Sequence, residues 1–100
     1  MEVHYSSKKH TWETPQDFFN KLNEIFNFNL DSCAETGTAK CLNFYTKEDD
    51  ALTKDWKGIV WCNPPYGREQ AKVLLKAYEE SLKHNSTVVV LIPARPNTKL

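Results

Sequence analysis

The residues best suited to chemistry form one short loop, Asn63-Pro64-Pro65-Tyr66. Proline fixes the backbone angle φ and has no N–H donor. Two successive prolines therefore hold the loop rigid and leave its carbonyl oxygens without competing backbone donors. The side chain of Asn63 and the main chain of Pro64 each present a carbonyl oxygen, and Tyr66 adds a flat aromatic face beside them. This set of groups is suited to hold an amino group on a planar ring.

The nitrogen of such an amino group is a poor nucleophile, because its lone pair is delocalised into the ring. Two acceptors that draw its hydrogens out of the ring plane would localise that lone pair toward an electrophile, so no strongly basic residue is needed. A base inside a duplex has to be flipped out to reach the loop. Stacking on Tyr66 would stabilise the flipped base by roughly 1–3 kcal/mol and so offset part of the cost of flipping. The alternative interpretation is an ordinary turn, for which Asn-Pro and Pro-Tyr-Gly are common material.

The elements around this loop form a β-α-β pattern. An apolar run over 59–62 predicts a buried strand, and the β-branched run over 87–92 predicts a second one that ends at Pro93. Between them, we expect a helix over 69–84 that ends near Asn85. Its expected buried stripe consists of Ala71, Leu74, Leu75, Tyr78 and Leu82. Ligands bind at the carboxyl ends of parallel strands, which is where the proline loop falls.

The first half of the chain gives a less regular pattern. Thr14 is expected to cap a helix over 15–26, with Pro15 in its first turn and Asp17 at the acidic position of a capping box. A short strand is predicted over 28–31 and ends on Asp31. We expect a loop leading into a short helical turn over 32–42, then loop and short helix over 45–57. Residues 1–11 are polar and are expected to form a flexible arm.

Composition limits the classes of protein that fit. One hundred residues, of which 40% are hydrophobic, allow a single domain with a real core. The formal net charge of zero lacks the basic excess that is usual for DNA-binding proteins. Three cysteines without a CxxC pair, and no apolar N-terminal stretch, indicate a reduced cytoplasmic protein. No spacing suits a metal site, and no apolar run is long enough to span a membrane.

Several separated motifs together resemble the phage-type DNA N-6-adenine methyltransferase family, a Dam-like family with an Asn-Pro-Pro-Tyr loop. They are Trp12-Glu13-Thr14-Pro15, Leu30-Asp31, Ala39-Lys40-Cys41, the stretch 50–56, the proline loop and Pro93-Ala94-Arg95. The resemblance implies an α/β fold, a three-layer Rossmann-like methyltransferase sandwich. It also implies methyl transfer from S-adenosylmethionine to N6 of adenine in double-stranded DNA, with the base flipped out, by a phage or prophage product in a bacterial host cell.

The resemblance assigns roles to individual residues. Asn63, Pro64, Pro65 and Tyr66 would form the catalytic loop. The cofactor would be bound by Asp31, Cys33 and Ala34, which resemble the first methyltransferase motif, together with Asp50, Thr14 and Pro15. Asp49 competes with Asp50 for this role. Asp31 has the alternative role of a capping acid in a loop. Arg68 and Arg95 would contact DNA phosphates or belong to an ordinary solvated surface.

The family continues beyond the position of Arg95 with further strands. We therefore expect the methyltransferase domain, residues 12–100, to be truncated at its C-terminus, its sheet being completed by a further segment or in a homo-oligomer. Two other functions remain open. The same loop occurs in enzymes that methylate glutamine amides in proteins, and a truncated relic would bind DNA without turnover.

Overall fold

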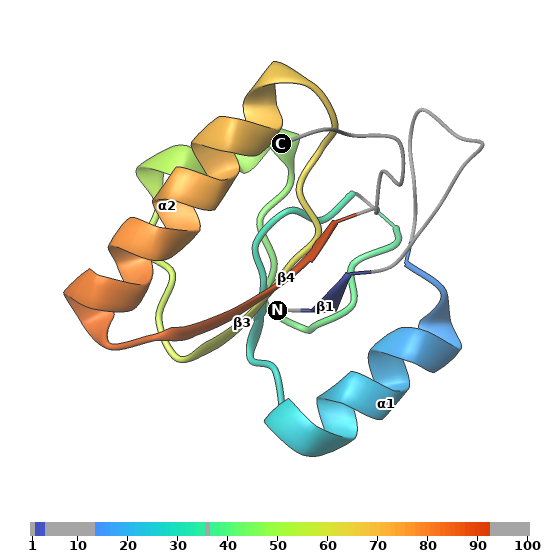
Figure 1. The fold of residues 1–100 in the computed structure, drawn as a ribbon. Coiled ribbons are helices and arrows are strands. Elements are labelled where there is room, and N and C mark those ends of the chain that lie inside the picture. The colour runs from blue at the N-terminus through green and yellow to red at the C-terminus, as the bar shows by residue number, and fades with distance from the viewer. Residues whose placement is uncertain (1, 4–13, 36, 93–100) are drawn as a thin grey trace.

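The computed structural model describes residues 2–3, 14–35 and 37–92. They form a four-stranded sheet with helices packed on it (Figure 1). The strands are β1 (Glu2–Val3), β2 (Leu30–Asp31), β3 (Ile59–Cys62) and β4 (Thr87–Ile92). All neighbours pair in parallel, in the order β1-β4-β3-β2. The chain is therefore an α/β protein with a parallel sheet, as the β-α-β pattern predicts.

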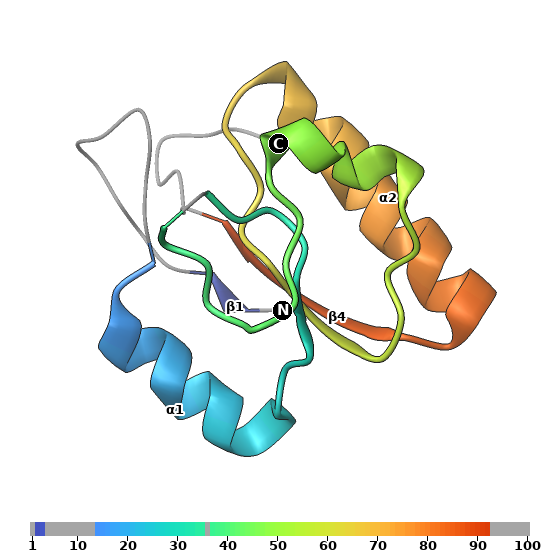
Figure 2. The same ribbon diagram turned by 180° about the vertical axis from the view of Figure 1, so that it is seen from behind.

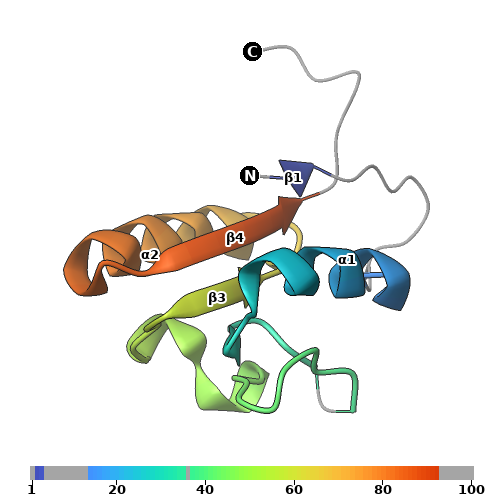
Figure 3. The same ribbon diagram turned by 90° about the horizontal axis from the view of Figure 1, so that it is seen from below.

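The pair β3 and β4 forms the centre of the sheet, and the two strands run side by side in the same direction (Figure 3). Their predicted bounds are confirmed. β2 is shorter than the predicted strand over 28–31. The expectation of an arm without structure over 1–11 is wrong at β1, because main-chain pairing with the edge of β4 requires no apolar pattern. Residues 4–11 lie outside the described part of the chain.

Two helices and two short 3₁₀ turns complete the described elements. The helices are α1 (Gln16–Phe26) and α2 (Arg68–His84), and the 3₁₀ turns are η1 (Lys47–Asp49) and η2 (Ala51–Thr53). These bounds agree with the predictions to within a residue for the helices, and the short helix expected within 45–57 is present. The helical turn expected within 32–42 is absent from residues 32–35 and 37–42. No helix in the described ranges is both long and apolar enough to cross a membrane.

The two helices cover opposite faces of the sheet (Figures 1 and 2). Successive side chains of a strand point to opposite faces. Val60 and Cys62 of β3 accordingly pack in one cluster with Val73 and Ala77 of α2. Trp61, between them in the sequence, packs in the other cluster with Phe19 of α1. The continuous apolar run of β3 is thus explained by a strand that is buried on both faces.

Of the five residues predicted to be buried on α2, Leu74 packs against the core, but the prediction is wrong for the other four, which are exposed. Leu75, Tyr78 and Leu82 remain 57%, 62% and 69% exposed. The helix instead buries its small and charged side, on which Val73, Ala77 and Glu80 lie. Apolar spacing marks one side of a helix but does not identify what covers it. The buried side of α2 therefore includes the paired carboxylate of Glu80, where the pattern predicts an apolar side chain.

Aromatic packing holds α1 against β3. The ring of Trp61 meets Phe19 at 5.1 Å and Phe28 at 5.4 Å between centroids, both edge-on. Edge-to-face contacts of this kind are favourable beyond the area they bury. Because Trp61 lies two residues before Asn63, these contacts place the start of α1 beside the proline loop.

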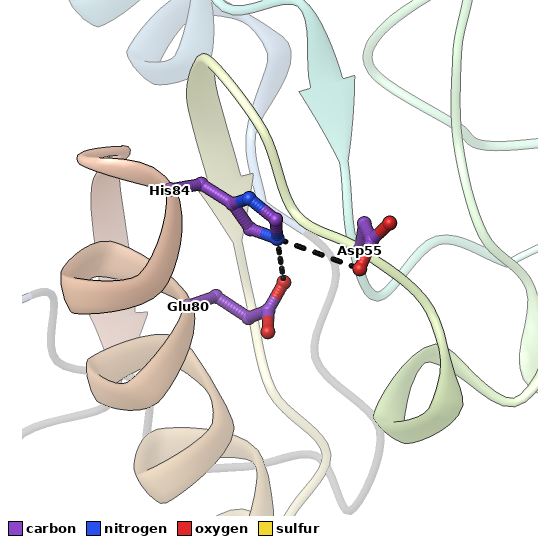
Figure 4. A group of neighbouring side chains, drawn as sticks. All are labelled: Asp55, Glu80 and His84. Carbon is purple, nitrogen blue, oxygen red and sulfur yellow. Dashed lines mark ion pairs between the residues drawn. The ribbon is translucent and has the colours of Figure 1, made fainter.

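A cluster of polar side chains around the buried Glu80 joins α2 to the segment before β3. Glu80 is 3% exposed, and its Oε1 accepts the main-chain N–H of Trp56 at 2.7 Å. Its other oxygen pairs with Lys76 at 3.3 Å. His84 Nε2 lies 3.3 Å from Glu80 Oε1 and 3.4 Å from Asp55 Oδ1, and Figure 4 shows these side chains converging. Glu80 therefore fixes the position of α2 relative to the strand that carries the proline loop.

Candidate active site at the carboxyl edge of the sheet

A cavity of about 650 Å³ lies where β2 and β3 end, and this volume is ordinary for a small-molecule site. The predicted residues that line it are Thr14, Asp31, Cys33, Ala34, Asp50, Asn63, Pro64, Pro65 and Tyr66. They come from four separate stretches of the chain. The fold therefore gathers the proline loop and most of the residues predicted for the cofactor around one cavity.

Asn63 is held by a residue that lies just before α1 in the sequence. Its Nδ2 donates to the hydroxyl oxygen of Thr14 at 3.0 Å. Thr14 is 2% exposed, so the bond is largely shielded from water. The predicted cap by Thr14 is wrong: Pro15 is the N-cap residue of α1, and no side-chain hydrogen bond caps the helix. The hydroxyl instead fixes the rotation of the Asn63 amide.

The rest of the proline loop leads into α2. Pro64 is buried, Pro65 is exposed and Tyr66 is half-buried, while all three line the cavity. Gly67 follows with a φ of 84°, a conformation that L side chains rarely adopt. This glycine lets the chain reverse from the loop into α2, which begins at Arg68. The loop is thus fixed at one end by β3 and at the other by a helix start.

Asp31 organises the loop that follows β2. One carboxylate oxygen accepts the main-chain N–H of Lys40 at 2.9 Å, and the other accepts that of Cys33 at 3.4 Å. Burial raises the pKa of Asp31 above its ordinary value of 3.8, and these two hydrogen bonds oppose the rise. The carboxylate both lines the cavity and shapes its wall, which matches the alternative role of a capping acid.

Cys33 and Cys62 lie next to one another, with 4.0 Å between their sulfurs. The hydrogen bond between the thiols lowers the pKa of Cys33 and raises that of Cys62, which is fully buried. Cys33 is half-buried and lines the cavity. The cavity wall therefore holds a thiol with increased thiolate character.

The two neighbouring acids Asp49 and Asp50 have different positions. Asp49 Oδ2 accepts both the N–H and the hydroxyl of Thr46, at 2.8 and 3.1 Å, and so closes a capping box at η1. Asp50 adopts a left-handed φ of 55° and lines the cavity, whereas Asp49 is absent from the lining residues. Of the two acids considered from the sequence, Asp50 is the one placed to meet a ligand.

Comparison with known proteins identifies the family of the chain. The sequence profile of the family described as DNA N-6-adenine-methyltransferase (Dam) matches residues 3–99. The chain belongs to this family. A DNA N-6-adenine-methyltransferase of Haemophilus phage HP1 is 42% identical over 96 residues, which are 93% of this chain and 55% of that protein. One of Escherichia phage T1 is 31% identical over 90 residues, 87% of this chain and 37% of its own length.

The chain thus spans about half the length of the first of these Dam relatives and less of the second. No solved structure gives a significant match. Family membership confirms the resemblance drawn from the sequence motifs.

Three of the residues predicted for the site of this Dam family member do not line the cavity or cannot be placed. Pro15 is exposed at the start of α1, and Arg68 is exposed at the start of α2. Neither is among the residues that line the cavity. Arg95 lies outside the described residues. The DNA-contact roles of Arg68 and Arg95 stay predictions.

Sequence reasoning missed the wall formed by Tyr45, Thr46 and Leu52. Tyr45 lies beside β2. Its main-chain N–H donates to the Asp31 carbonyl at 3.0 Å, and its carbonyl accepts the main-chain N–H of Ala34 at 2.8 Å. Its hydroxyl donates to the carbonyl of Asp55 at 2.7 Å. Main-chain pairing of this kind leaves no apolar period in the sequence.

Proposed function

We propose that this chain transfers a methyl group from S-adenosylmethionine to N6 of adenine in double-stranded DNA, on a Rossmann-like methyltransferase fold. The observation that carries the proposal is the position of Asn63. It follows the central strand β3, lines the cavity and has its amide held by Thr14. Family membership supports the same reaction.

The residues of the cavity fit the cofactor. Five acidic residues and two lysines line it, although the whole chain is neutral. An acidic cavity favours a cationic ligand such as a sulfonium and disfavours DNA phosphate. Ala34 and Leu52 supply apolar wall, and the Asp50 carboxylate is suited to accept hydrogen bonds from amino or hydroxyl groups. When bound, S-adenosylmethionine supplies an electrophilic methyl group.

The proline loop would hold the acceptor amine. The Asn63 side-chain oxygen and the Pro64 carbonyl accept its two hydrogens, and this draws electron density onto the nitrogen. The ring of Tyr66 stacks on the base. Because Asn63 Nδ2 is bonded to Thr14, we assign the amide oxygen rather than the nitrogen to the substrate amine. No residue of the chain then has to accept a proton before the nitrogen attacks.

A base has to leave the duplex to reach this loop, because its amino group cannot enter the cavity while the base is stacked and paired. Arg68 is exposed directly after the loop, at the start of α2. We assign it to the phosphate backbone beside the flipped base, where one cation would add a salt-dependent contact.

The test is to identify the methylated product. The purified chain is incubated with S-adenosylmethionine carrying a labelled methyl group, unmethylated duplex DNA and, separately, a protein extract. Nucleosides and amino acids are then analysed by mass spectrometry. Label in N6-methyladenine is expected. Label in methylcytosine or in glutamine would refute the assignment of the acceptor. Saturable cofactor binding without any transfer would identify a non-enzymatic relic.

A further inference from the structure

The outer side of α2 carries an apolar stripe with no cover from the described residues. Ala71, Leu75, Tyr78 and Leu82 are all exposed, the three large ones by more than half. We call these four residues the outer stripe. They recur at steps of four, three and four, the spacing of a seam between two packed helices. Such a row on a solvated surface is typical of an interaction site.

The outer stripe points away from the sheet. At about 100° per residue, the centre of Leu75, Tyr78 and Leu82 lies roughly 165° around the helix from the centre of the buried residues Val73, Ala77 and Glu80. A further helix packed on the same face of the sheet would lie beside α2 and would not cover the outer stripe. Whatever covers the outer stripe has to pack on the side of α2 that faces away from the sheet.

We propose that the occupant is a second copy of this chain, with the two α2 helices packed antiparallel across a two-fold axis. In this register Leu75 packs against the partner's Tyr78, and Ala71 packs against the partner's Leu82. The small residue thus meets a large one at each end of the seam. A two-fold interface uses one patch twice, so each contact occurs twice.

The charges beside the outer stripe favour this orientation. Lys72 and Glu79 flank the same side of the stripe and are both exposed. In the antiparallel register, Lys72 faces the partner's Glu79 and Glu79 faces the partner's Lys72, which gives two reciprocal ion pairs. Lys72 now pairs with Glu69 at 3.3 Å on the surface, where both side chains are more than half exposed, so little is lost when it changes partner.

A parallel arrangement lacks this complementarity. It would set the side with Lys72 and Glu79 against the partner's other flank, which carries Leu74 and Ser81. Flanking charges of this kind set the orientation of paired helices. One pair of helices buries less area than a standard protein interface. We therefore expect a reversible dimer that forms in the micromolar range.

Sedimentation equilibrium of the full chain tests the dimer. Wild type is expected to show a monomer–dimer equilibrium across the micromolar range. L75S combined with L82S is expected to remain monomeric. Circular dichroism confirms that each variant stays folded. E24K on the exposed face of α1 is the matched control, and it should sediment as wild type does.

Charge reversal tests the register independently of the apolar substitutions. K72E alone and E79K alone each set like charges against one another twice, so dimerisation should weaken by about tenfold at low salt. The double variant K72E/E79K restores both pairs with exchanged signs and should recover wild-type dimerisation. A chain that is monomeric throughout overturns the proposal. A double variant as weak as the single ones overturns the antiparallel register.

Discussion

Asn63 and Thr14, 49 residues apart in the sequence, are joined by a hydrogen bond of 3.0 Å from the amide nitrogen to the hydroxyl oxygen. The bond joins the end of β3 to the stretch that leads into α1, and Thr14 is almost wholly buried. It gives the amide one orientation. Because the proposed mechanism needs the amide oxygen to face the substrate amine, Thr14 is a positioning residue for the loop.

Replacing Thr14 with valine keeps its shape and removes the hydroxyl. We expect single-turnover methyl transfer by T14V to fall by about tenfold, the value of one buried hydrogen bond, since the Asn63 amide can then rotate. Binding of S-adenosylmethionine should change little. T14S retains the hydroxyl and should restore most of the rate. Equal loss in both variants would assign Thr14 a purely steric role.

Cys33 should be the most reactive thiol of the chain. Its pKa is lowered by the hydrogen bond with Cys62, whereas burial raises the pKa of Cys41 to about 11. Iodoacetamide near neutral pH is therefore expected to modify Cys33 first. S-adenosylmethionine should slow the modification, because Cys33 lines the cavity. Peptide mass spectrometry follows each site, and unchanged labelling of Cys33 in the presence of the cofactor would place the cofactor elsewhere.

Changing Asp31 to asparagine should weaken cofactor binding. An amide offers one acceptor and one donor where the carboxylate now accepts from the N–H groups of Lys40 and Cys33. One loop N–H then loses its partner, and the dissociation constant measured by calorimetry should rise by roughly tenfold. D49N is the control, since Asp49 lies in the same region but caps η1. An equal effect of both variants would contradict a specific role of Asp31.

Glu80 should control stability. E80A leaves the Trp56 N–H without its acceptor and should lower the free energy of unfolding by roughly 3 kcal/mol in urea. E24A, an exposed acid on α1, should change it by less than about 0.5 kcal/mol. A loss as small as that of E24A would show that Glu80 does not fix the position of α2.

The same carboxylate gives stability a pH dependence. Burial acts to raise the pKa of Glu80, but the Trp56 hydrogen bond, Lys76 and His84 outweigh it and hold the pKa below its ordinary value of 4.5. A lowered folded-state pKa contributes stability above the unfolded value and loses it as the pH falls through the folded one. The difference between wild type and E80A should therefore shrink below about pH 4.5.

The parts of the fold that were predicted correctly share one property. Like α1, each of β3, the proline loop, α2 and β4 is marked in the sequence by a local apolar pattern or by prolines. The predictions that were wrong concern features that depend on contacts between residues far apart in the sequence. The apolar stripe of α2 was assigned to the core because nothing in the sequence shows that Glu80 reaches Trp56, 24 residues away. The bond between Thr14 and Asn63 was likewise not predicted, because helix capping already explained the position of Thr14.

Asn63 is proposed to hold the acceptor amine of adenine, and its replacement by alanine tests this role. The rate at which N6-methyladenine forms in unmethylated duplex DNA is measured for wild type and N63A at saturating cofactor, with cofactor binding measured alongside. N63A is expected to lose at least about a hundredfold in rate, while its affinity for S-adenosylmethionine should stay within about threefold, since Thr14 and Asp31 still shape the cavity. Methylation by N63A at the wild-type rate would contradict this role.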